Sequence, residues 1–91
     1  MEQKDKDALI VAAALQRLIK FRLPRALSLK KKVDSGELMN DFDLNFLRRS
    51  LDDARDLNPI LERNPDYLGL RDKAVGLCEQ ILKKNADNES G

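Results

Sequence analysis

The fold of this chain is decided by residues 39–63, MNDFDLNFLRRSLDDARDLNPILER. Asn40 can act as an N-cap residue, because its side chain accepts a hydrogen bond from an unpaired backbone N–H of the first turn. Asp43 stands three residues later, where the acid of a capping box reaches back. Met39 and Leu44 occupy the two positions of a hydrophobic staple. These signals predict a helix that begins directly after Asn40.

One face of this predicted helix is apolar over its whole length. At about 100° per residue, its apolar side chains gather in an arc of roughly 160°, and charged side chains fall opposite. The apolar side chains belong to Leu44, Phe46, Leu47, Leu51, Ala54, Leu57 and Leu61. Pro59 falls on the polar side, where a proline bends a helix while the freed carbonyl faces water. We predict a helix over residues 41–63 that is bent near Pro59; a helix that stops near Asn58 is the alternative.

The first predicted helix covers residues 5–21, with Asp5 or Asp7 as its N-cap. Its apolar residues form two stripes on roughly opposite sides. The main stripe consists of Ala8, Val11, Ala12, Leu15, Leu18 and Ile19. The second stripe, interrupted by Arg17, consists of Ile10, Ala14 and Phe21. A helix that is apolar on two sides is either covered by neighbours on both, or leaves one side for a partner.

Two more helices complete the predicted fold. One covers residues 24–35, with Pro24 at its first position and Gly36 as the left-handed residue that ends it. One continuous helix kinked at Pro24 is the alternative. The last helix covers residues 65–85, with Asn64 as its N-cap. We therefore predict an all-α fold, a small antiparallel bundle of four helices with short connections.

Size and composition fit one small domain over residues 1–91, with residues 1–4 and 86–91 disordered. The chain is 42% hydrophobic, enough for one small core, and has a net charge of +1. A single cysteine excludes an intrachain disulfide framework. The longest apolar run, Ala8–Leu15, is far shorter than the roughly 20 residues that span a bilayer. We expect a soluble, cytoplasmic protein that does not bind membranes.

The charges are distributed unevenly along the chain. Residues 8–33 contain no acid and seven basic residues: Arg17, Lys20, Arg22, Arg25, Lys30, Lys31 and Lys32. Residues 34–91 contain thirteen acids and eight bases, a net charge of −5. The basic segment either pairs internally with the acidic part of the fold, or binds phosphates or an acidic partner. Both interpretations remain open at this point.

No residue pattern indicates an enzyme. The chain has no histidine, the commonest general base and metal ligand. Cys78 lies within an apolar face, without a histidine that would activate it. Asp52 and Asp56 are one turn apart, but arginines lie beside them, so a solvated row of charges is favoured over a metal site. We expect no catalytic residue, no metal ligand and no cofactor.

We therefore predict a non-enzymatic small helical protein that acts by protein–protein interaction, as an adaptor or regulator. The candidate interaction surface consists of Ile10, Ala14, Arg17, Lys20, Phe21 and Arg25. The partner is a second copy of the chain or another protein. The alternative is a nucleic-acid-binding or regulatory protein that uses the basic segment 17–32, although no aromatic residues alternate with its charges as stacking on single strands requires.

Overall fold

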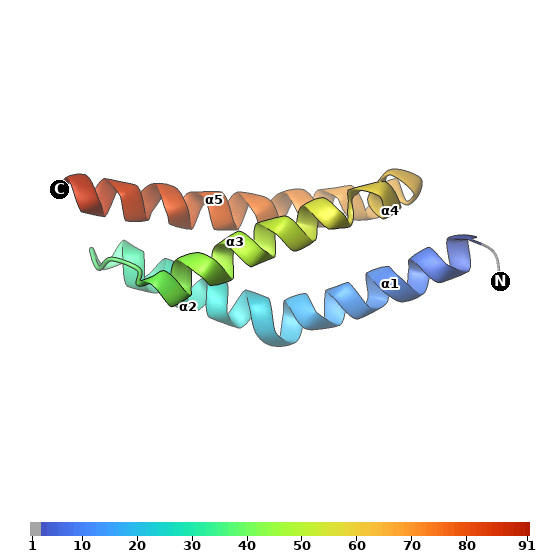
Figure 1. The fold of residues 1–91 in the computed structure, drawn as a ribbon, viewed down its shortest axis with the longest axis horizontal. Coiled ribbons are helices and arrows are strands. Elements are labelled where there is room, and N and C mark those ends of the chain that lie inside the picture. The colour runs from blue at the N-terminus through green and yellow to red at the C-terminus, as the bar shows by residue number, and fades with distance from the viewer. Residues whose placement is uncertain (1–2) are drawn as a thin grey trace.

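The computed structural model describes the backbone of residues 3–91, and the side chains from residue 6 onward. Throughout this range the regular structure is helical and no strand occurs, so the predicted all-α bundle is confirmed. The molecule is elongated, with extents of 53 × 20 × 18 Å. The chain runs along the long axis three times in alternating directions (Figure 1). Met1 and Glu2, part of the segment expected to be disordered, lie outside the described residues.

The first pass consists of α1 (Gln3–Arg17), a π-helix (Leu18–Arg22) and α2 (Leu23–Asp34). The two helices predicted here are thus joined without a loop, as in the alternative of one kinked helix. The irregular turn precedes Pro24. Proline has no N–H to donate and its ring crowds the carbonyl four residues earlier, so the helix widens at that point.

The two sequence signals that precede the central helix, the turn at Gly36 and the capping box, are confirmed. Gly36, at φ 92°, ends α2 in the left-handed conformation. The backbone N–H of Gly36 donates to Val33 O at 3.0 Å, and that of Glu37 donates to Lys32 O at 3.2 Å, which together form a Schellman motif. The helix α3 (Asp41–Asp56) then begins with the predicted capping box. Asp43 N donates to Asn40 Oδ1 at 2.9 Å, and Asn40 N donates to Asp43 Oδ2 at 3.2 Å.

The second pass continues through Leu57 into α4 (Asn58–Arg63), so the predicted bend lies just before Pro59. A 3₁₀ turn, η2 (Pro65–Tyr67), leads into α5 (Leu68–Ser90). The side chain of Asn64 does not cap this last helix, contrary to prediction. Instead, Asn64 Nδ2 donates to Ile60 O at 2.9 Å and to a carboxylate of α1.

Helix α5 also extends past the predicted end at residue 85, through most of the segment expected to be disordered. Two asparagines hold this extension against the α2–α3 turn. The buried Asn85 accepts a hydrogen bond from Met39 N at 2.9 Å. Asn88 Nδ2 donates to Val33 O at 2.8 Å and to Glu37 O at 2.9 Å. These bonds pair Met39 N–H and Glu37 O of the turn, and give Val33 O a second donor beside Gly36 N–H.

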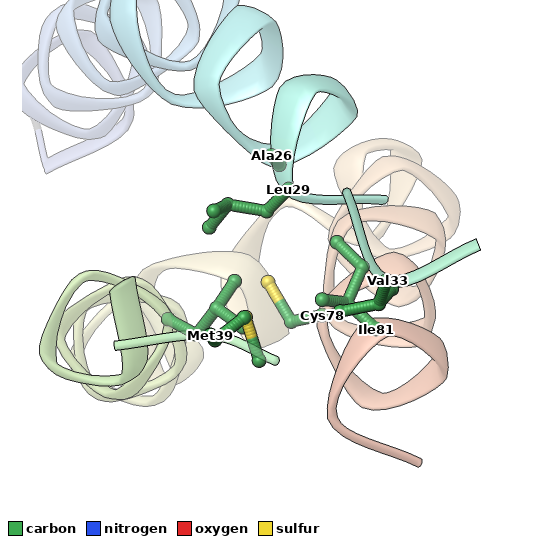
Figure 2. Close-up of a cluster of buried hydrophobic side chains, with 7 residues drawn as sticks. Ala26, Leu29, Val33, Met39, Cys78 and Ile81 are labelled. Carbon is green, nitrogen blue, oxygen red and sulfur yellow. The ribbon is translucent and has the colours of Figure 1, made fainter. Parts of the chain in front are cut away.

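The core lies at the end of the molecule where α2, α3 and α5 pack together (Figure 2). Its fully buried members include Val33, Leu47 and Ile81. Helix α1 diverges from the other two passes (Figure 1). Among the described hydrophobic side chains of α1 only Val11 is buried, and the main packing partner of α1 in the second pass is α4. The fold therefore has a well-packed end, and a middle region in which the first pass stands apart from the other two (Figure 1).

Candidate docking cleft

The divergence of α1 leaves a cleft of about 510 Å³ along the middle of the molecule. One wall comes from α1 and the π-helix, and includes Val11, Ala14 and Leu18. The opposite wall comes from α3, α4 and α5, and includes Leu61, Ala74 and Cys78. The side chains of the walls are mostly apolar. The faces of α3 and α5 that pack in the core continue into this cleft, where α1 stands apart from them.

Helix α1 is held at both ends of the cleft. At its N-terminal end, the fully buried carboxylate of Asp7 accepts hydrogen bonds from Arg63 Nε at 2.9 Å and Arg63 Nη2 at 3.0 Å. Asn64 Nδ2 donates to the same carboxylate at 3.0 Å. This hydrogen-bonded pair raises the pKa of the Arg63 guanidinium. At the other end the π-helix joins α1 to α2, which is buried in the core. The cleft is thus spanned by a helix that is attached at its two ends.

This role corrects the prediction for Asp7. It does not cap α1, which begins at Gln3; it joins α1 to the α4–η2 turn instead. Sequence spacing gives no sign of this contact, because the partners are 56 and 57 residues away.

Charged side chains border the cleft. Arg22 forms an ion pair with Asp53 across the cleft edge. Arg71 Nη1 donates to Asn58 Oδ1 at 2.6 Å, between α5 and α4. Among the described side chains, Arg17, Lys73 and Asp56 border the cleft without an ion pair. An apolar interior with polar edges is the usual composition of a site that binds another molecule.

Cys78 lies buried in the cleft wall, as the prediction of a structural thiol requires. Burial raises the pKa of this thiol; the charge of Arg22 opposes the shift, and that of Glu79 adds to it. A thiol with a raised pKa is a poor nucleophile at neutral pH. The described residues also contain no group of three or more Cys, Asp or Glu side chains that could hold a metal ion.

The structure does not bring the six predicted interaction residues together. Ile10, Ala14 and Arg17 line the cleft. Lys20 and Phe21 lie outside the cleft. Both residues are exposed, Phe21 to 69%. Arg25 lies on the α2–α3 side of the molecule, with its guanidinium carbon 4.5 Å from the centre of the Phe46 ring. Three of the six residues thus line the cleft, and the other three lie outside it.

The main apolar stripe of the first helix is also only partly buried. Val11 is buried and Leu15 and Leu18 are half-buried, whereas Ala12 and Ile19 are exposed. Ile19 lies within the π-helix itself and is 63% exposed. Sequence reasoning missed the opposite wall of the cleft, because Ala54, Ala74 and their neighbours have the pattern of ordinary core residues.

Most of the basic segment is paired within the fold. Its ion pairs join α2 and the π-helix mainly to α3, which supports the internal interpretation of the charge pattern. The pairs are Arg22 with Asp53, Arg25 with Asp43 at 3.8 Å, Lys30 with Asp34 at 2.6 Å, and Lys32 with Asp43 at 3.1 Å. The three other basic residues, Arg17, Lys20 and Lys31, are exposed and form no ion pair with a described side chain.

No family model, curated protein or solved structure significantly matches this chain. Across the described residues, no helix is both long and apolar enough to cross a membrane. The function is therefore inferred from the cleft and the charges around it.

Proposed function

We propose that this protein is a non-enzymatic helical module that acts by protein–protein interaction, as an adaptor or regulator. Its partner contributes an amphipathic helix that docks into the cleft between α1 and the α3–α5 pair. The observation that carries this proposal is the apolar cleft of about 510 Å³, open to solvent and spanned by a helix attached at both ends. Docking of a helix in an apolar groove is a common mode of peptide recognition.

The size of the cleft suits one face of a helix. A ten-residue helix, about 10 Å wide and 15 Å long, occupies roughly 1,200 Å³. The cleft of about 510 Å³ takes less than half of that. The apolar face would enter, and the polar face would remain in water beside the charged rim of Arg17 and Lys73.

The energetic reason for occupation is the hydrated apolar surface of the walls. The cleft is open, so water fills it and remains in contact with these walls. Covering them with apolar side chains is favourable, which supplies the driving force for docking.

The test compares partner capture by three forms of the intact protein from cells that express it. In Ala14→Leu/Ala74→Leu, larger side chains fill the cleft from both walls. Ala12→Leu makes the same change on the outer side of α1, where Ala12 is exposed, and is the matched control. We expect the wild type and the control to capture the same partner, and the filled variant to lose at least nine-tenths of it. Equal capture by the filled variant would refute docking in the cleft.

Nucleic-acid binding through the segment 17–32 is the alternative, and the ion pairs reduce its support. Only Arg17, Lys20 and Lys31 are free of pairing with described side chains. Three phosphate contacts would give a log–log salt slope of about −3 on duplex DNA. Fluorescence anisotropy with a labelled duplex at low salt checks this. Binding with that slope would favour the alternative, and no binding would remove it.

A further inference from the structure

A second apolar surface lies on the outside of the first pass, apart from the cleft interior. Ile19, Leu23 and Leu27 are 63%, 37% and 50% exposed. We call these three residues the outer stripe. They follow one another at intervals of four residues. A regular α-helix would displace each by about 40° around the axis, but the wider π turn before Leu23 offsets this drift. The three side chains therefore follow one line along the helix, and only Leu23 also borders the cleft.

The charges beside the outer stripe have one sign. Lys20 and Lys31 are exposed and, among the described side chains, have no ion-pair partner. Residues 8–33 contain no acid. The acid next in sequence, Asp34, is paired with Lys30 at 2.6 Å, so its charge is compensated. An apolar line with unpaired lysines beside it is complementary to an apolar line bordered by carboxylates.

We propose that the outer stripe docks an acidic amphipathic helix of a partner protein. Its apolar face would cover Ile19, Leu23 and Leu27, and its carboxylates would pair with Lys20 and Lys31. A symmetric dimer through this surface does not fit, because pairing two outer stripes would place basic side chains against basic side chains in either direction. A membrane surface fits less well, because interfacial helices bury a broad apolar face, whereas this stripe is one side chain wide.

The experiment uses two synthetic helical peptides as probes. Both carry leucines at intervals of three and four residues; one has glutamates beside them, and the other has lysines at the same positions. Binding to the 91-residue chain is measured by fluorescence anisotropy, and the contacted residues are mapped by ¹⁵N chemical shifts. We expect the glutamate peptide to bind at least ten-fold more tightly than the lysine peptide. Lys20→Glu/Lys31→Glu should reverse this preference.

Two further variants separate the outer stripe from the cleft. Ile19→Ser/Leu27→Ser changes two exposed side chains, so the fold should persist, which circular dichroism and urea unfolding verify. This variant should bind the glutamate peptide at least ten-fold more weakly. Ala14→Leu/Ala74→Leu, which fills the cleft, should bind it as the wild type does.

Four results would overturn the inference. One is equal affinity for the two peptides. Another is loss of binding in the cleft-filled variant alone, which would favour the cleft as the helix site and leave the proposed function standing.

The third result is self-association in sedimentation that Leu27→Ser abolishes. The fourth is binding of phosphatidylserine vesicles through the outer stripe without discrimination between the peptides.

Discussion

Filling the cleft with leucine side chains should stabilise the protein in the absence of any partner. Ala14 and Ala74 are suitable positions, because both are half-buried and they line opposite walls of the cleft. Both lie in regular α-helices, where alanine and leucine have similar helix propensities. The substitution therefore changes packing and little else. Each new side chain should enter the space between α1 and α5.

The expected magnitude follows from the carbon atoms that are added. Alanine to leucine adds three carbons, and at about 0.8 kcal/mol each the ceiling is about 2.4 kcal/mol per site. The cleft is open, so we expect about half of this. Each single variant should gain about 1 kcal/mol in the free energy of unfolding, and the double variant about 2 kcal/mol.

Urea unfolding followed by circular dichroism measures these changes. Ala12→Leu places the same side chain on the exposed side of α1 and should change stability by less than about 0.5 kcal/mol. A loss of 1–3 kcal/mol in the cleft variants would be the mark of an overpacked interior. That result would mean that α1 closes against α5 in solution, and it would refute the cleft.

Four other variants or conditions test separate parts of the structure. Asn40→Ala removes the capping-box acceptor and should destabilise the protein by about 1 kcal/mol in urea unfolding, whereas Asn40→Ser should retain most of the stability. Gly76→Ala should stabilise it by about 1 kcal/mol by the same assay, because a Cβ there meets no atom within 4 Å. Asp7→Asn should speed amide hydrogen exchange in α1 more than in α5, since it weakens the contact with Arg63. Because burial raises the pKa of Cys78 above its ordinary 9.0, the folded state retains the thiol proton more strongly than the unfolded chain does. The stabilisation that Cys78 contributes is therefore fully present below pH 9.0, the ordinary pKa of the thiol, and is lost as the pH rises through the higher pKa of the folded state. Unfolding curves from pH 7 to 11 measure this loss.

Local signals in the sequence predicted local structure well. The capping box of Asn40 and Asp43 and the turn at Gly36 were predicted because each depends on residues within a few positions of one another. The bend near Pro59 was predicted for the same reason. The effect of Pro24 was predicted less well, since a proline in a helix can either start a new helix or distort the preceding turn, and packing decides between them.

The site could not be predicted, because it depends on contacts between distant residues. The apolar face of a helix shows that something should cover it, but it does not show whether a neighbour lies close enough to do so. The contact of Asp7 with Arg63 and Asn64, which holds α1 across the cleft, joins residues 56 and 57 positions apart. Partner sites on amphipathic helices are therefore easily mistaken for core faces.

The most direct test of the central claim is a titration of the ¹³C-methyl-labelled protein with benzene, a small apolar probe that enters apolar cavities. We predict saturable shifts of the methyl signals of Val11, Leu61 and Leu77, which line the cleft from α1, α4 and α5. The methyl signals of Leu27, on the outer stripe, should stay nearly unchanged. If the three cleft residues do not shift, or shift no more than Leu27 does, the cleft is absent in solution and the account is wrong.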